Sequence, residues 1–238
     1  MTWSIIARDK ETGCFGIAVA TKFFAVGARV PFIAAAVGAV ATQALVNLFY
    51  GTNGLRFLRK GLPADAVVQA LISADPGREH RQVHVMDAGG RVAAHTGAAC
   101  IDWCGHIHGD GFSLAGNMLA GPRVLDDSAA AYLANDASSF PRRLIAAMQA
   151  GEAAGGDKRG KQSAALLIYG EEEWSDLDLR VDDHPEPLDE LDRLERISRE
   201  RWMAFRRCLP NHRDPVGITD RTIIEQEIAQ ALAAASRQ

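Results

Sequence analysis

The sequence predicts an α+β protein in which sheets are layered against helices. The chain opens with two apolar strands, residues 3–8 and 15–21, joined by a five-residue turn that contains Gly13, as a hairpin loop of this length favours. Along the whole chain, strand-like and helix-like segments come in groups, in the order strands, helices, strands, helices, strands. Grouped elements of this kind are typical of α+β domains.

The elements after the opening hairpin are predicted from apolar spacing. Residues 29–42 form a nearly unbroken apolar run, which predicts one strand buried on both faces. Residues 51–54 (Gly-Thr-Asn-Gly) predict a turn, and the spacing over 55–74 predicts a helix that Gly61 and Pro63 divide in two. The later predicted strands are residues 82–87, 91–95, 112–116, 163–169 and 177–181, and the later predicted helices are residues 124–134 and 138–150.

The composition changes after residue 182 to an Arg- and Glu-rich amphipathic helix, and a second helix is predicted around residues 223–232. We therefore predict a domain over residues 1–187 and a helical extension over residues 188–238. The extension is expected to pack on the domain or on a second copy of the chain, forming a homodimer.

The composition excludes several classes of partner. A chain of 238 residues that is 47% hydrophobic can bury a large core, and a net charge of −4 without a basic stripe makes nucleic acid an unexpected partner. Neither a run of ~20 apolar residues nor a signal peptide is present, so we expect no membrane span. Four cysteines in a chain of this length fit a reduced, cytoplasmic protein. We predict no cofactor, and a small molecule as the substrate.

Thr2 is the candidate nucleophile. Its side chain is small enough for an aminopeptidase to remove Met1, which would leave a hydroxyl and a free α-amine on one residue at the tip of a buried strand. An α-amine titrates near ~8 and can take the proton of the neighbouring hydroxyl at neutral pH. Thr is also a common second residue, so its position alone does not distinguish a catalyst from an ordinary terminus.

Residues 100–110 (CIDWCGHIHGD) place six potential metal ligands at alternate positions. An extended strand presents them on one face, but neighbours on that face are about 7 Å apart, so one ion reaches only two or so of them. The spacing is not that of a zinc finger or ribbon. We predict no metal site, with metal-assisted hydrolysis through His106 and His108 as the alternative.

Three other places carry acids, bases or cations. Asp157 precedes Ser163 at the entrance to a strand, where a solvated loop carboxylate is the alternative. Asp183 and His184 form an acid/base cluster or a plain turn, since prolines follow. Lys22 ends the second strand, and its side chain either leaves the sheet edge or points into a site.

Five blocks of the sequence resemble one known family. They are TWSIIARDKETGCFGIAVATKFFAVGA, VGAVATQALVNLFYG, GNMLAG, GGDKRGKQSAALLIY and LRVDDHPEP, in this order between residues 1 and 187. On these blocks the chain resembles the domain of unknown function 1028 (DUF1028) family, which is similar to the N-terminal-nucleophile (Ntn) hydrolases. The resemblance implies a four-layer αββα sandwich, with two antiparallel sheets between two layers of helices.

The resemblance also implies roles for matching residues. Thr2 matches the N-terminal nucleophile, and Lys22 lies where a cation would keep the α-amine neutral. A backbone N–H near Thr42 would stabilise an oxyanion, and Asn117 would bond the amine or the oxyanion. Asp157 and Ser163 would support the amine, although the spacing of six residues between them is wider than in the proteasome. The residues expected to bind substrate are Thr42, Gln43, Asn47, Ser163, Asp183 and His184.

Two hypotheses of function follow. The first is an amidohydrolase in which Thr2 attacks a C–N amide-type bond of a small molecule, with its own amine as base. The second is a catalytically silent module of the same fold that binds a small metabolite or a protein. The terminus distinguishes them, because retention of Met1 would leave the free amine on the wrong residue.

Overall fold

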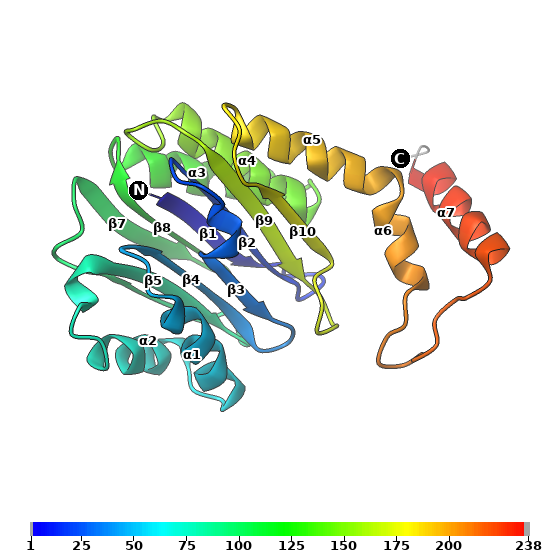
Figure 1. The fold of residues 1–238 in the computed structure, drawn as a ribbon, viewed down its shortest axis with the longest axis horizontal. Coiled ribbons are helices and arrows are strands. Elements are labelled where there is room, and N and C mark those ends of the chain that lie inside the picture. The colour runs from blue at the N-terminus through cyan, green and yellow to red at the C-terminus, as the bar shows by residue number, and fades with distance from the viewer. Residues whose placement is uncertain (1, 236–238) are drawn as a thin grey trace. The chain divides into compact units, whose positions relative to one another are not determined.

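The opening hairpin lies at the centre of a six-stranded sheet (Figure 1). The computed structural model describes residues 2–235. β1 (Thr2–Arg8) pairs with β2 (Phe15–Thr21) on one side and with β8 (Phe112–Leu119) on the other. The order is β10-β9-β2-β1-β8-β7, with antiparallel neighbours throughout. The outer strands are β7 (Trp103–Gly109), β9 (Ser163–Tyr169) and β10 (Leu177–Val181).

A second antiparallel sheet has the order β3-β4-β5-β6. Its strands are β3 (Pro31–Ala34), β4 (Gly38–Ala44), β5 (Arg81–Asp87) and β6 (Val92–Thr96). The prediction of one strand over residues 29–42 is wrong, because the chain reverses between β3 and β4. Ala36 and Gly38 have positive φ angles of 55° and 142° in this turn, which an unbroken apolar run does not reveal.

α1 (Leu48–Arg59) and α2 (Ala64–Ser73) cover the outer face of the second sheet. The predicted turn at residues 51–54 is wrong, since these residues lie inside α1. A Cβ at Gly51 would lie 2.2 Å from Phe32 Cδ2, and one at Gly54 would lie 3.0 Å from Val40 Cγ2. The two glycines therefore allow α1 to approach the sheet closely.

α3 (Arg123–Ala134) and α4 (Phe140–Ala153) pack on the outer face of the first sheet. The layers are therefore helix, sheet, sheet and helix, as Figure 1 shows, and the predicted αββα sandwich is confirmed. The predicted strands at residues 163–169 and 177–181, and the hairpin formed by β5 and β6, are also confirmed.

The space between the two sheets is apolar over one part and polar over another. Ile6, Ile17 and Met86 belong to the apolar cluster, and each is fully buried. Thr2 and Ser4, which alternate with apolar residues at the start of β1, are also buried, at 7% and 0% exposure. Because burying polar groups costs free energy unless they are hydrogen-bonded, this polar part of the interior is the candidate functional site.

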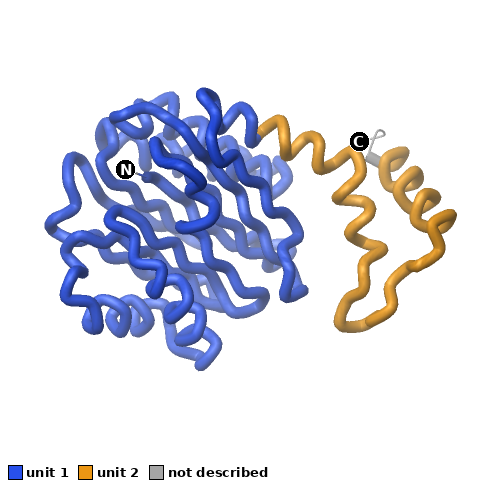
Figure 2. Tube along the Cα trace, viewed as in Figure 1, with its two compact units in different colours: residues 1–191 blue, residues 192–238 orange. Residues whose placement is uncertain are grey.

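The chain divides into two compact units, residues 1–191 and 192–238 (Figure 2). The predicted boundary between residues 187 and 188 falls at the start of α5 (Pro187–Glu200), which α6 (Trp202–Phe205) and α7 (Arg221–Ala235) follow. Packing of the extension on the domain or on a second copy stays a prediction. Within residues 2–235, none of the helices has both the length and the apolar composition to cross a membrane.

Candidate active site

The register of the first sheet brings four polar side chains into one row at the end of its strands. Asn117 of β8 lies opposite Thr2 of β1, and Thr21 of β2 lies opposite Ser163 of β9. Thr2 Oγ1 donates a hydrogen bond to Thr21 Oγ1 over 3.2 Å, which joins the two pairs. Residues opposite each other in an antiparallel sheet share a face. The structure thus brings Thr2, Asn117 and Ser163 together, and Thr21 completes the row.

The main chain of Thr2 is held by two side-chain amides. Its carbonyl oxygen accepts hydrogen bonds from Gln43 Nε2 and from Asn117 Nδ2, each at 3.4 Å. Bonds of this length are weak. The Gln43 amide has closer acceptors for both of its hydrogens, Gln82 Oε1 at 2.8 Å and Ala115 O at 3.1 Å, whereas one hydrogen of the Asn117 amide remains able to find another acceptor. Met1, whose removal or retention distinguishes the two hypotheses of function, lies outside the described residues.

A buried glutamine joins the groups around Thr2 to the second sheet. Gln82 Oε1 accepts hydrogen bonds from Gln43 Nε2 at 2.8 Å and from Asn117 Nδ2 at 3.0 Å. The acceptors of Gln82 Nε2 are Gly116 O at 2.8 Å, Gly105 O at 3.0 Å and Thr96 Oγ1 at 2.9 Å. Gln82 is fully buried, and both ends of its amide are fully used. It therefore fixes the two side chains that hold Thr2.

Ser4 extends this network to His84. Ser4 Oγ donates to Gln43 Oε1 over 2.7 Å, so His84 Nε2, at 2.9 Å from the same hydroxyl oxygen, is the protonated ring nitrogen. His84 Nδ1 then accepts from Ser113 Oγ at 3.0 Å. Burial, with a smaller contribution from His106, lowers the pKa of His84 to about 3. His84 is therefore a neutral bridge between the sheets at pH 7.

The side chain of Asp157 contacts the main chain of Lys22. The buried Asp157 carboxylate accepts the N–H of Lys22 and the N–H of Arg159, both at 2.8 Å, and pairs with the Arg159 guanidinium at 3.3 Å. The ammonium of Lys22, which was expected beside the α-amine of Thr2, is exposed and donates to Lys161 O over 3.2 Å. The structure therefore does not place this cation in the group around Thr2.

Ser163 holds the segment that follows β2. Its hydroxyl donates to Phe23 O over 2.5 Å and accepts the N–H of Val26 over 3.2 Å. Val26 begins the short 3-10 helix η1 (Val26–Ala28). Together with the Asp157 contact to Lys22, these bonds fix residues 22–26 against the end of the first sheet.

Thr42 and Asn47 fix the passage from β4 into α1. The N–H of Thr42, expected near an oxyanion, donates to Val30 O over 3.2 Å, so this donor is already engaged. Thr42 Oγ1 donates to Asn47 O over 3.2 Å. Asn47 is the N-cap of α1, where its Oδ1 accepts the N–H of Phe49 at 3.1 Å.

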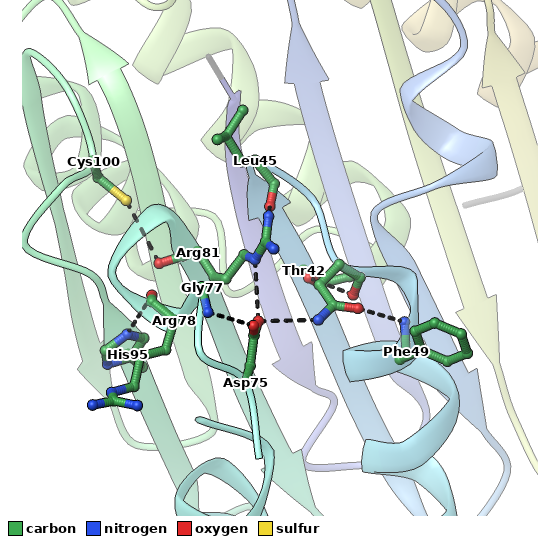
Figure 3. A network of polar contacts seen from close by, with 10 residues as sticks. Thr42, Leu45, Phe49, Asp75, Gly77, Arg78, Arg81, His95 and Cys100 are labelled. Carbon is green, nitrogen blue, oxygen red and sulfur yellow. Dashed lines mark hydrogen bonds and ion pairs between the residues drawn. The ribbon is translucent and has the colours of Figure 1, made fainter. Parts of the chain in front are cut away.

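Asp75 links this helix cap to an arginine (Figure 3). Its Oδ2 accepts from Asn47 Nδ2 and from Arg81 Nε, each at 3.1 Å, and its Oδ1 accepts the N–H of Gly77 at 2.7 Å. Burial raises the pKa of Asp75, but these hydrogen bonds outweigh it and lower the pKa to about 2. Arg81 Nη1 also donates to Leu45 O over 2.6 Å, which fixes the guanidinium in place.

Asp183 and His184 form an exposed turn after β10. Asp183 Oδ1 accepts from Gln162 Nε2 at 3.0 Å, and the N–H of His184 donates to Gln162 O over 2.8 Å. His184 Nδ1 accepts the N–H of Glu186 at 3.0 Å. Neither residue lines the cavity at Thr2 described next.

A cavity of about 460 Å³ opens at Thr2. This volume lies in the range of small-molecule sites. Its lining combines three uncharged polar residues, Thr2, Thr21 and Gln43, with two arginines and mainly apolar side chains. The described residues that line it are Thr2, Thr21, Phe23, Val26, Arg29, Val30, Gln43, Ala44, Leu45, Val46 and Arg81.

The segment rich in cysteine and histidine lies at the edge of the first sheet, where residues 103–109 form β7. His106 Nδ1 lies 2.9 Å from Thr96 Oγ1, and Cys100 Sγ donates to Arg81 O over 3.5 Å. In the part of the chain that the structure describes, no group of three or more Cys, His, Asp or Glu side chains is arranged to hold a metal ion.

Five residues of this region were missed by sequence reasoning: Thr21, Arg29, Arg81, Gln82 and His84. Gln82 and His84 did carry a signal, because they alternate with Val83 and Val85 and therefore place polar groups on one face of an apolar strand. The two arginines carried none, since arginine is common on protein surfaces.

The chain is thus an αββα sandwich in which a hydroxyl residue, Thr2, begins a central strand and lies beside a cavity. The model of a family of unknown function, DUF1028, matches residues 2–191, so the chain belongs to that family. It is similar to a crystal structure of a DUF1028 protein from Silicibacter pomeroyi, with 35% identity and a TM-score of 0.85 over 92% of this chain and 99% of that chain.

The chain is also similar to Anbu (ancestral beta-subunit) from Yersinia bercovieri, with 12% identity and a TM-score of 0.35 over 82% of this chain and 94% of that chain. No curated protein matches the chain.

Proposed function

We propose that this protein hydrolyses a C–N amide-type bond of a small molecule, with Thr2 as the nucleophile. The observation that carries the proposal is the Thr2 hydroxyl at the wall of a cavity of about 460 Å³, beside the Thr21 hydroxyl at 3.2 Å. The resemblance of DUF1028 proteins to Ntn hydrolases supports the choice of reaction. Fold alone does not establish an activity, so the proposal rests on the chemistry available at Thr2.

In the proposed mechanism, removal of Met1 first gives Thr2 a free α-amine. The amine takes the proton of Thr2 Oγ1 while this oxygen attacks the carbonyl carbon of the substrate. The C–N bond then breaks, the leaving amine receives the proton, and the acyl group remains on Thr2 Oγ1 as an ester. Water attacks the ester, the carboxylic acid leaves, and the hydroxyl and the amine are restored.

Asn117 is the proposed donor to the oxyanion. One of its amide N–H groups donates to Gln82 Oε1 over 3.0 Å, and the other is spent on a weak 3.4 Å bond to Thr2 O, so this second N–H can turn to a stronger acceptor. Both N–H groups of Gln43 already have closer acceptors, Gln82 Oε1 at 2.8 Å and Ala115 O at 3.1 Å. A charged oxygen is such an acceptor, and removing one donor from an oxyanion site typically lowers the rate about 10²–10³-fold. In this proposal Asp157 and Ser163 act on the substrate only indirectly, through the segment that they hold.

The experiment is a covalent-labelling and mass measurement on the untagged protein. We expect an intact mass without Met1, and labelling by a β-lactone, an electrophile that acylates activated hydroxyls, on the peptide that begins with Thr2. Thr2→Ser should keep the labelling and any amide turnover, and Thr2→Ala should abolish both while remaining folded. Thr52→Ala, which removes an exposed hydroxyl on α1, is the matched control.

A retained Met1 together with an unlabelled Thr2 would contradict the hydrolase. The second hypothesis, a silent module that binds a small metabolite, would then take its place, because the cavity does not depend on a free amine.

A further inference from the structure

The charges around the cavity at Thr2 have one sign. Among the described residues that line it, the charged ones are Arg29 and Arg81, and no carboxylate lines it. The remaining lining residues are apolar or carry uncharged polar groups. Cations on the wall of a largely apolar cavity create a positive potential there and attract an anionic ligand.

Arg29 is the cation with spare donors. It is half-buried, and its Nη1 donates to Ala25 O over 3.2 Å. Within residues 2–235 no carboxylate forms an ion pair with it. A guanidinium has five N–H donors and can bind a carboxylate through two parallel hydrogen bonds, so most of its donors remain for a ligand.

The segment that presents Arg29 is held in a strained conformation. Ala25 has a φ of 53°, in the left-handed region that alanine rarely adopts. Its N–H donates to Asp182 O over 2.9 Å, and the next N–H, of Val26, donates to Ser163 Oγ. Such strain persists only where surrounding contacts hold it, and it concentrates at functional sites.

Arg81 contributes from another segment. Asp75 and Leu45 O hold its guanidinium, as Figure 3 shows. The adjacent lining residue Ala44 is also left-handed, with a φ of 69°. Since Asp75 partly balances Arg81, the charge left for a ligand belongs mainly to Arg29.

We propose that the substrate of this site is a small amide that also bears a carboxylate, of the kind found in N-acyl amino acids. Arg29 binds the carboxylate, the apolar side chains of Phe23, Val26 and Val30 pack on the apolar part, and the amide carbonyl faces Thr2. The inference rests on the proposed function only in the last of these contacts. The first two concern binding and hold without turnover.

The test uses binding to the Thr2→Ala protein, which cannot be acylated, measured by isothermal titration calorimetry. The probes are a series of straight-chain N-acylglycines and the corresponding neutral N-acylglycinamides, which differ in the carboxylate alone. We expect the best acid to bind at least about tenfold more tightly than its amide, as one charge-assisted hydrogen bond implies. The preference should weaken as ionic strength rises.

Variants assign the preference to Arg29. In the Thr2→Ala background, Arg29→Met should weaken binding of the acid about tenfold or more and leave binding of the amide nearly unchanged. Arg29→Lys, which keeps the charge but not the planar fork, should retain part of the preference. Arg59→Met, which removes an exposed arginine of α1, is the matched control and should change neither affinity.

Equal affinity for acids and amides, binding of neither series, or an unchanged preference in a folded Arg29→Met protein would overturn the proposal. Thermal melting of each variant establishes that it is folded, and Arg29→Lys replaces Arg29→Met if the latter does not fold. A carboxylate preference without any labelling of Thr2 would uphold this inference and contradict the hydrolase, so the two failures are distinguishable.

Discussion

Replacement of Gln82 by leucine tests whether one buried amide organises the site. Gln82 is fully buried, and it is the shared acceptor for Gln43 and Asn117, the two side chains that hold the Thr2 carbonyl. Leucine has a similar volume and no polar atoms. The variant therefore removes the hydrogen bonds and leaves the space filled.

The magnitude follows from the bonds that disappear. The amide of Gln82 makes four full hydrogen bonds, two through its oxygen and two through the hydrogens of its nitrogen, over distances of 2.8 to 3.0 Å. At ~1 kcal/mol each, their loss destabilises the protein by about 4 kcal/mol. Burial of the leucine side chain returns roughly 1 kcal/mol. We expect a net loss of about 3 kcal/mol in the free energy of unfolding.

Urea denaturation followed by circular dichroism measures this loss. Gln69→Leu, the same substitution at an exposed position of α2, is the control and should change the free energy of unfolding by less than about 0.5 kcal/mol. Labelling of Thr2 in folded Gln82→Leu should also slow, because Gln43 and Asn117 lose their common acceptor. A loss no larger than that of Gln69→Leu would refute the assignment of Gln82 as the organising residue.

Two further predictions concern acid stability and close packing. Because burial lowers the pKa of His84 to about 3, the unfolded chain binds a proton below pH 6.5 that the folded protein does not. The free energy of unfolding should therefore fall by about 1.4 kcal/mol per pH unit on acidification towards pH 3. Urea denaturation at a series of pH values measures this dependence, which should be weaker in His84→Gln. An equal pH dependence in the two proteins would contradict the assignment to His84. A Cβ at Gly97 would lie 2.3 Å from Glu79 O, so Gly97→Ala should lose about 1–3 kcal/mol, whereas Gly121→Ala, with nothing within 4 Å, should melt like the wild type.

Local patterning predicted most strands and helices of the sandwich because its signals lie within a few residues of one another. The alternation in the β5–β6 hairpin and the apolar run of β9 are examples, and both appear where expected. The errors arose where a distant contact decided the local structure. Gly51 and Gly54 suggest a turn by themselves, but in the fold they are the positions at which α1 touches Phe32 and Val40 of the second sheet.

The candidate site was partly predictable for the same reason. Thr2 could be selected from its own chemistry, and Asn117 and Ser163 from the resemblance of their surrounding blocks to a family. Gln82 left only the signal of a polar position on an apolar strand, because its partners Gln43 and Asn117 lie far away in the chain. Arg29 left no signal, because its place at the cavity exists only in the folded chain. Lys22 shows the opposite case, since its position in the sequence suggested a cation at the site and its ammonium bonds Lys161 O instead.

The sequence by itself determined the layered α+β architecture and the proposed nucleophile, Thr2, because apolar periodicity and the identity of one side chain are local properties. Only the tertiary structure decided what surrounds that residue. The pairing of β1 with β2 and β8 sets Thr2 beside Thr21 and Asn117, and the facing sheet supplies Gln43. Hydrogen bonds and charges act over a few ångströms, and those distances exist only once strands from distant parts of the chain have paired.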